Sequence, residues 1–217
     1  MNGLAMWYFL YNLILTVGFV LALPLTPILA CLRPRYRTGL AQRFGLYPRN
    51  LLSSLVGSRP VWVHAASVGE VRSAAPLLQA LKARAPQGKI LLSTFTATGN
   101  RQARQIEGID AVIFLPLDVL WIVRRALAKL DPALLVIIET EIWPNLLRQA
   151  YRRGVPALLL SGRLSARSLA RYKLVGRFFA RVLGCFSAFG MQSEEDAARV
   201  VNLGADQKKV SVVGTLK

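Results

Sequence analysis

After residue 60 the chain alternates short apolar runs with longer amphipathic segments. The runs are almost continuously apolar, which is typical of strands that are buried on both faces of a parallel sheet. They predict strands at Val61 to His64, Ile90 to Thr94, Ala111 to Leu115, Leu134 to Ile138, Ala157 to Leu160 and Ala188 to Met191. The intervening segments predict helices at Glu70 to Arg84, Asn100 to Ile106, Leu120 to Leu130, Asn145 to Arg153, Ala166 to Leu183 and Glu194 to Leu203. This alternation predicts an α/β fold with a parallel sheet and flanking helices.

The N-terminal segment has a different pattern, because no charged residue occurs from Leu4 to Leu32. The stretch from Leu4 to Leu23 is long enough, at about 1.5 Å per helical residue, to cross roughly 30 Å of hydrocarbon. Pro24 and Pro27 would end that helix. A cleaved signal peptide is the alternative, but no basic residue precedes Arg33. We therefore expect residues 1–32 to form an uncleaved membrane anchor, followed by a basic connector over 33–59.

Composition supports a membrane partner. The chain has 217 residues, 53% of them hydrophobic, and a formal net charge of +17. Arginines directly after the anchor predict, by the positive-inside rule, that the rest of the chain is cytoplasmic. Cys31 and Cys185 fit that compartment as reduced thiols.

An acid-free stretch, from Ile142 to Ser193, is rich in arginine. Such a surface should bind phosphate groups. Anionic lipid, a phosphorylated glycolipid and nucleic acid all carry phosphate, and the predicted membrane anchor makes lipid the favoured partner.

Four loops that follow predicted strands carry the candidate chemistry. In open α/β sheets the ligand lies beyond the carboxyl ends of the strands, so these loops should open on one edge. They are HAASVGE (64–70), TFTATGN (94–100), ETEIWPN (139–145) and SGRLSARS (161–168).

The first loop fits either a helix cap or a catalytic base. Ser67 and Glu70 have the spacing of a capping box, the more common meaning of this pattern. A helix N-terminus should also lower the pKa of Glu70, which would make it a weaker base. For catalysis, Gly69 would let a substrate approach the backbone, and a carboxylate at a strand end suits general-base work.

The second loop offers hydroxyls and a glycine at a strand-to-helix turn. Thr96, Thr98 and Gly99 would cradle a phosphate or a sugar, or the threonines would simply cap the helix. The loop lacks the glycine spacing of nucleotide-binding motifs.

The last two loops carry charges. Glu139 follows a buried strand and Glu141 comes two residues later, positions that suit either an ion pair or a functional cleft. Arg163, Arg167 and Arg171 are spaced by four and would line one helical face, which we expect to bind phosphate. His64 is the only histidine, and no cluster has metal-ligand spacing, so we expect no metal and no hydrolase triad.

Together these motifs resemble one family, the 3-deoxy-D-manno-octulosonic acid (Kdo) transferases. The resemblance covers the whole chain: an apolar N-terminus, QRFGLYP (42–48), the four loops, QSEEDAARVVNLGA (192–205) and GTLK (214–217). It implies a Rossmann-like sheet that forms the N-terminal, acceptor-binding lobe of a GT-B glycosyltransferase over residues 60–213. Residues 214–217 would begin the linker to a donor lobe that this chain lacks.

The resemblance also implies roles. Glu70 matches the proton acceptor, and Glu139 and Lys217 match residues that stabilise the transition state. Substrate binding is then expected from Ser67, Gly69, Thr96, Thr98, Gly99, Glu141, Arg163 and Arg167. The implied reaction is an inverting, metal-independent transfer of Kdo from CMP-Kdo to a lipid A precursor at the inner membrane, without a cofactor.

Two alternatives remain open. The chain would be a catalytically silent, membrane-bound module for anionic glycolipid if no donor lobe accompanies it. Nucleic-acid binding rests on charge alone, and no recognition motif accompanies the arginines, so we expect no nucleic-acid partner.

Overall fold

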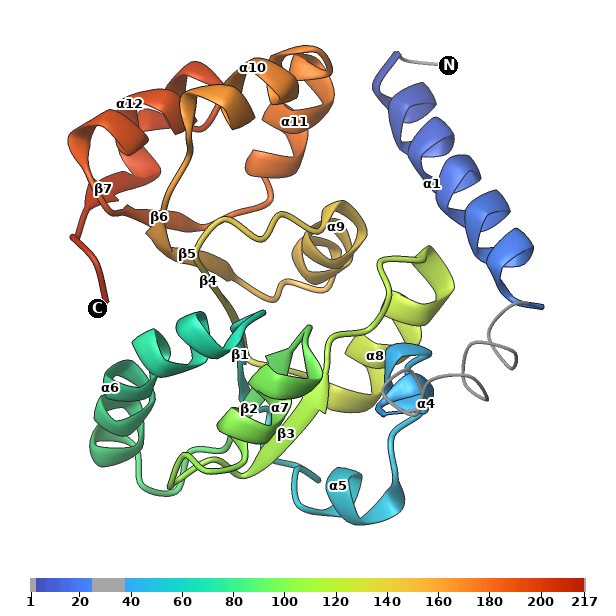
Figure 1. Ribbon diagram of the computed structural model, residues 1–217, viewed down its shortest axis with the longest axis vertical. Helices are drawn as coiled ribbons and strands as arrows, with labels where there is room; N and C mark the ends of the chain where they lie inside the picture. Colours follow the sequence, from blue (N-terminus) through green and yellow to red (C-terminus); the bar gives the residue numbers. More distant parts are fainter. Residues whose placement is uncertain (1–2, 25–37, 217) are drawn as a thin grey trace.

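The computed structural model describes residues 3–24 and 38–216, and its centre is a seven-stranded parallel sheet (Figure 1). The strands are β1 Val61–His64, β2 Ile90–Thr94, β3 Ala111–Phe114, β4 Leu134–Ile138, β5 Ala157–Gly162, β6 Ala188–Met191 and β7 Val210–Val212. The α/β fold class predicted from the apolar runs is confirmed.

The strand order is β3-β2-β1-β4-β5-β6-β7. The chain winds outward from β1 in one direction, then returns to pair β4 with the other side of β1, with Val63 opposite Val136. This is a doubly wound sheet, whose topological switch point lies between β1 and β4.

The helices after the connector are α6 Val68–Arg84, α7 Ala97–Ala103, α8 Leu120–Leu130, α9 Pro144–Arg152, α10 Ala166–Lys173, α11 Gly176–Leu183 and α12 Glu194–Asn202. They cover both faces of the sheet. Helices α6 and α7 pack on the face that carries Val63 and Leu92. Helices α8, α9 and α11 pack on the face that carries Trp62 and Leu135. Because alternate residues of each strand enter opposite cores, nearly every strand residue is apolar.

Element boundaries differ from the prediction where local chemistry decides them. The helix predicted over Ala166 to Leu183 is two helices, broken at Val175, whose φ of −121° and ψ of 35° are not helical. Gly176 follows, and glycine disfavours a helix interior by about 1 kcal/mol. The break allows Phe178 to enter the core beside α1. Strand β7 lies in the last residues of the predicted lobe, where no strand was predicted.

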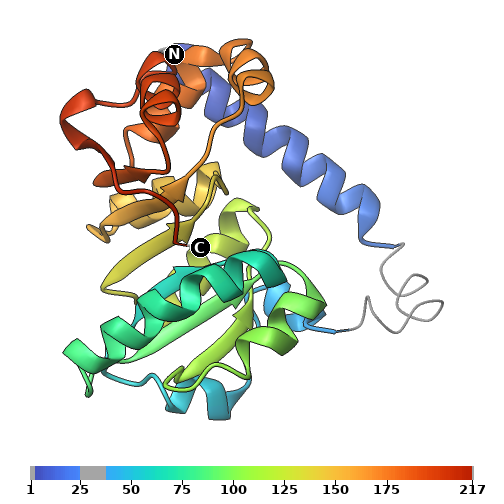
Figure 2. The same cartoon turned by 60° about the vertical axis from the view of Figure 1, so that its left-hand side comes forward.

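The N-terminal segment forms helix α1 Gly3–Ala22, which runs along one side of the lobe (Figures 1 and 2). Among the described residues, no helix combines the length and hydropathy that a membrane crossing requires. The predicted membrane crossing over Leu4 to Leu23 is not confirmed. Polar groups within the helix make protein contacts instead, since Tyr11 donates a hydrogen bond to Asp118 and Asn145 donates one to Asn12.

The connector contains two short helices, α4 Leu40–Arg43 and α5 Arg49–Ser53. Gln42 accepts a hydrogen bond from the backbone N–H of Phe114, which fastens the connector to the edge strand β3. Several predictions fall outside the described residues, namely those for Cys31, Pro27 and the arginines at 33, 35 and 37.

Candidate functional site

The switch point brings the first and third predicted loops together. HAASVGE follows β1 and ETEIWPN follows β4, and these two strands pair directly. The chains leaving them diverge to opposite faces, because α6 packs on one face and α9 on the other. A crevice at such a point is the usual ligand site of a doubly wound sheet.

Glu70 lies at this edge as the third residue of α6. Ser67 caps the helix, and its hydroxyl accepts from the Glu70 N–H at 3.4 Å. The Glu70 carboxylate accepts from the Ser67 hydroxyl at 2.8 Å and from the Ala66 N–H at 2.7 Å. The cap that Ser67 provides is therefore confirmed, but the second half of the predicted capping box is not formed, because the Glu70 carboxylate accepts from the Ala66 N–H rather than from the N-cap amide.

The pKa of Glu70 is raised, contrary to our expectation that the helix N-terminus would lower it. Partial burial of the carboxylate is the largest cause of this increase, and the negative charge of Glu139 raises the pKa further. The hydrogen bonds from Ala66 and Ser67 favour the ionised form but do not outweigh these two effects. A carboxylate with a raised pKa is a better proton acceptor.

Glu139 and Glu141 lie within electrostatic range of Glu70. Burial raises the pKa of Glu141, and the charge of Glu70 raises it further. Glu139 has a φ of 59°, a left-handed conformation that is uncommon for glutamate. Its N–H donates a hydrogen bond to the Leu160 carbonyl at 2.9 Å. Strained backbone of this kind concentrates at functional sites. The structure thus gathers three acidic side chains at the switch point.

The TFTATGN loop packs against the first loop through the backbone. The N–H groups of Phe95 and Thr96 both donate to the Ala66 carbonyl, at 3.0 and 3.1 Å. Thr96 also caps α7, because its hydroxyl oxygen accepts from the Gly99 N–H at 3.0 Å. Gly99 is buried, and a Cβ there would lie 3.2 Å from the Ser67 carbonyl carbon. Of the three predicted binding residues in this loop, Thr96 and Thr98 are exposed and Gly99 is buried.

The fourth loop is tied to the third. The Thr140 hydroxyl donates to the Arg163 carbonyl and accepts from the Arg163 N–H at 2.9 Å. Arg163 and Arg167 are both exposed, the second in the first turn of α10. Gly69 is also exposed, and a Cβ there would meet nothing closer than 3.9 Å. Lys217 lies outside the described residues, while the Leu216 N–H reaches Ser161 Oγ at 3.4 Å.

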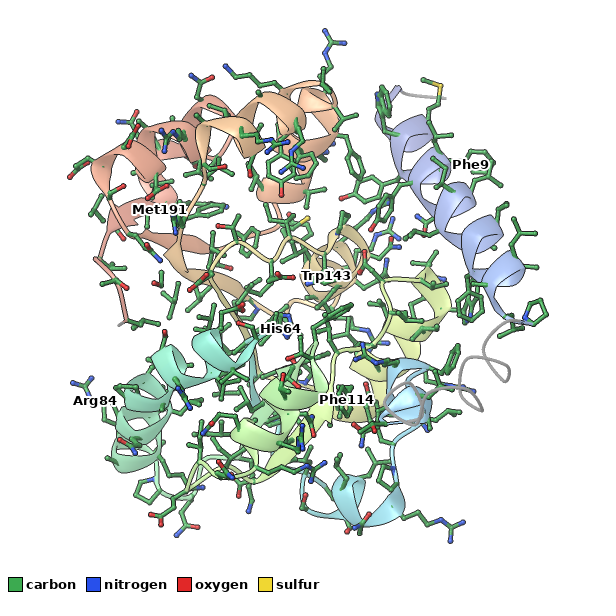
Figure 3. All side chains as sticks on the ribbon, viewed as in Figure 1. Phe9, His64, Arg84, Phe114, Trp143 and Met191 are labelled. Carbon is green, nitrogen blue, oxygen red and sulfur yellow. The ribbon has the colours of Figure 1, made fainter. Side chains whose placement is uncertain are left out.

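Several residues at this edge were not predicted from the sequence. Phe95 and Trp143 stack with ring centroids 5.8 Å apart, and the Arg43 guanidinium lies 4.9 Å from the Phe95 centroid. These contacts join segments far apart in the chain, so no local pattern signals them. His64 and Trp143 lie near the centre of the molecule (Figure 3). Burial lowers the pKa of His64 to about 4, so its imidazole is neutral.

The buried carboxylate of Asp118 holds the end of the ETEIWPN loop through hydrogen bonds. It accepts hydrogen bonds from the N–H groups of Asn145 and Leu146, at the start of α9, each at 2.8 Å. It also accepts one from the Tyr11 hydroxyl of α1 at 2.8 Å. Burial raises the pKa of Asp118 to about 6. This network connects α1 to the loop that carries Glu139 and Glu141.

In the ranges 3–24 and 38–216, no group of three or more His, Cys, Asp or Glu residues is placed to hold a metal ion. The edge offers carboxylates from Glu70, Glu139 and Glu141 and the exposed guanidinium groups of Arg163 and Arg167.

The doubly wound sheet, with its candidate site at the switch point, defines the class of the protein as a GT-B-like lobe. A solved UDP-GlcNAc 2-epimerase from Neisseria meningitidis is similar, with a TM-score of 0.52 and 14% identity over 72% of this chain and 47% of that one, a likeness of fold. The family model described as 3-deoxy-D-manno-octulosonic-acid transferase (kdotransferase) matches residues 38–217. The chain belongs to this Kdo transferase family.

Relatives named 3-deoxy-D-manno-octulosonic acid transferase agree with the family model. The one from Haemophilus influenzae is 34% identical over 98% of this chain and 49% of its own length. The one from Chlamydophila psittaci is 32% identical over 96% of this chain and 48% of its own length. The chain thus spans about half the length of these curated relatives and corresponds to the N-terminal portion of the enzyme.

Proposed function

We propose that this chain is the acceptor-binding lobe of an inverting transferase that moves Kdo from CMP-Kdo to a lipid A precursor, without a metal or a cofactor. Membership of the family supports the two substrates. The donor would be bound by a further lobe, because the chain covers about half of its relatives.

The position of Glu70 is the observation that carries the proposal. Its carboxylate lies at the switch point, is fixed by two hydrogen bonds and has a raised pKa. In the proposed step it takes the proton of the acceptor hydroxyl while that oxygen bonds to the anomeric carbon of Kdo. The bond between that carbon and the phosphate oxygen breaks, and CMP leaves with the electron pair on the opposite face.

Glu139 would stabilise the positive charge that develops on the Kdo ring in the transition state. Its proximity to Glu70 supports this role, because the charge of Glu139 contributes to the raised pKa of Glu70. For Lys217 we propose, from the family resemblance, a contact with the phosphate of the departing CMP.

Acceptor contacts are proposed for the groups that the edge leaves open. Gly69, Thr98, Arg163 and Arg167 are exposed there, and the arginines suit the phosphates of a lipid A precursor. Ser67, Thr96 and Gly99 would act indirectly. Ser67 holds Glu70 by a hydrogen bond, and Thr96 and Gly99 pack the two loops together. Glu141, half-buried beside Glu70, would accept a sugar hydroxyl.

We further propose that the protein works on the cytoplasmic face of the inner membrane. Helix α1 exposes large apolar side chains, among them Phe9 at 61%, Leu13 at 46% and Val17 at 48% exposure. Phe9 points away from the lobe (Figure 3). An exposed apolar face next to a basic surface favours contact with an anionic lipid surface.

The test uses the full-length enzyme, CMP-Kdo and a lipid A precursor, with product measured by mass spectrometry. Wild type should form the Kdo adduct, and Glu70→Gln should reduce the rate by about 10²–10⁴-fold. Glu107→Gln is the matched control, because Glu107 is exposed and lies before β3, at the amino end of the sheet. It should retain the wild-type rate.

The rival function, a silent glycolipid-binding module, makes the opposite prediction. Wild type would then bind the lipid A precursor but form no Kdo adduct at any CMP-Kdo concentration. That result would contradict the proposed transfer.

A further inference from the structure

An apolar groove lies between α1 and α11, beside the ETEIWPN loop. Its volume is about 330 Å³, at the small end of ligand pockets. Helix α1 contributes Leu10 and Ile14, the loop contributes Ile142, and α11 contributes Phe178 and Phe179.

The groove is open to solvent along α1. Leu10 is 41% exposed and Ile14 is 62% exposed, although both line it. Beyond the groove the same helix exposes Val17 and Leu21, so the apolar surface continues outward along its length. A soluble polar ligand would gain little from such walls, whereas a hydrocarbon chain would gain about 0.8 kcal/mol for each buried methylene.

The inner end of the groove adjoins the candidate active site. Ile142 directly follows Glu141, whose pKa is raised by burial and by the charge of Glu70. On the other wall Phe179 stacks on Tyr172, with centroids 4.1 Å apart. The charge of Glu141 also acts on Tyr172. A chain that filled the groove would therefore end beside the acidic cluster.

Basic residues flank Val175, one of the residues that line the groove. Lys173 and Arg177 flank the turn between α10 and α11, and both are exposed. Leu174 between them is 84% exposed. No acidic residue occurs from Ile142 to Ser193. The occupant should therefore combine a hydrocarbon chain with a negatively charged head group.

We propose that this groove holds an acyl chain of the anionic glycolipid acceptor and thereby fixes the depth at which its sugar meets Glu70. The inference rests on the proposed function for the identity of the acceptor. Its physical content, a groove selective for an alkyl chain with an anionic head, is testable without any transfer reaction.

The test is a binding titration of the full-length enzyme with dodecyl phosphate, kept below its critical micelle concentration and followed by calorimetry. Ile14→Trp would fill the groove from its exposed wall. Leu21→Trp is the matched control, because Leu21 is 69% exposed on the same helix and does not line the groove. We expect Ile14→Trp to raise the Kd at least about tenfold and Leu21→Trp to leave it unchanged.

Three results would overturn the inference. The first is equal Kd values for Ile14→Trp and wild type. The second is binding of inorganic phosphate as tight as that of dodecyl phosphate, which would assign the affinity to the arginines alone. The third is a wild-type dimer in sedimentation that Ile14→Trp dissociates, which would make the groove a contact between two copies.

Activity separates this inference from the proposed function. With a lipid A precursor as acceptor, Ile14→Trp should raise the acceptor KM, whereas with the deacylated precursor its KM should equal that of wild type. Absence of Kdo transfer by wild type would contradict the proposed function and leave the dodecyl phosphate result to decide on the groove.

Discussion

Glu70 uses one carboxylate oxygen for the Ser67 hydroxyl and the other for the Ala66 N–H. Both bonds fix its orientation at the start of α6, yet neither donor removes its basicity, because burial and Glu139 raise its pKa. The cap that Ser67 provides was predictable from the spacing of Ser67 and Glu70. The direction of the pKa shift was not, since it depends on loops that pack around the carboxylate only in the folded chain.

Replacing Glu139 should change the pH dependence of the reaction. Glu70 must be ionised to accept a proton, so the rate should rise with pH through its pKa. Glu139→Gln removes a negative charge that raises this pKa, so the acidic limb should move to lower pH, along with a lower maximal rate. The measurement is kcat/KM against pH for both enzymes. An acidic limb at the same pH in both would contradict the coupling between the two glutamates.

Two glycines of the site should respond oppositely to alanine. A Cβ at Gly69 would meet nothing closer than the Ser67 hydroxyl at 3.9 Å, so Gly69→Ala should not lower the Tm but should raise the KM for the acceptor. A Cβ at Gly99 meets the backbone of Ala66 and Ser67, so Gly99→Ala should cost about 1–3 kcal/mol of stability. Thermal unfolding and acceptor kinetics on both variants check this. A wild-type KM in Gly69→Ala would argue against substrate approach there.

At the scale of elements, loops and helices are held by partners distant in sequence. Asp118 joins the start of α9 to Tyr11 of α1. The sequence predicts both helices, but an isolated aspartate between a strand and a helix gives no sign of such a role. Likewise, the register of β4 against β1 follows from the fold, and it places Glu139 beside Glu70.

Asp118→Asn should destabilise the protein by about 2–4 kcal/mol, because an amide cannot accept from all three donors and leaves buried N–H groups unpaired. The control is Asp131→Asn, whose exposed ion pair with Arg59 at 3.7 Å should contribute little. Urea denaturation of both variants measures the difference. An equal free energy of unfolding in the two variants would contradict the network.

The same residue predicts a pH dependence of stability. The folded-state pKa of Asp118, about 6, lies above its ordinary value of 3.8, so the native state binds more protons between these values. The stability contributed by Asp118 is therefore complete below pH 4 and is lost as the pH rises through about 6. The stability difference between wild type and Asp118→Asn should shrink over this range. A difference that is constant from pH 4 to 7 would refute the raised pKa.

At the scale of the whole molecule, the parallel sheet was predictable because each strand is apolar on both faces. The role of α1 was not. Its apolar composition predicted a membrane crossing and gave no sign that Tyr8, Tyr11 and Asn12 make contacts within the protein. One side of the helix therefore packs on the lobe while the other exposes apolar side chains.

Membrane association through this exposed side is measurable by flotation with vesicles. Binding to anionic vesicles should exceed binding to zwitterionic ones and should weaken as salt rises. The double variant Phe9→Ser and Leu13→Ser should reduce it, whereas Val56→Ser, at a 79% exposed position in the connector, should not. Equal flotation of the double variant and wild type would contradict a lipid contact through α1.

Single-turnover kinetics test whether Glu70 removes the proton of the acceptor hydroxyl. The full-length enzyme and its Glu70→Gln variant are saturated with CMP-Kdo, mixed with lipid A precursor and quenched over time. We predict a Kd for the acceptor within about threefold of wild type and a transfer rate lower by about 10²–10⁴-fold, at an unchanged Tm. A transfer rate within a few-fold of wild type would show that Glu70 only caps α6 and would contradict its role as the proton acceptor.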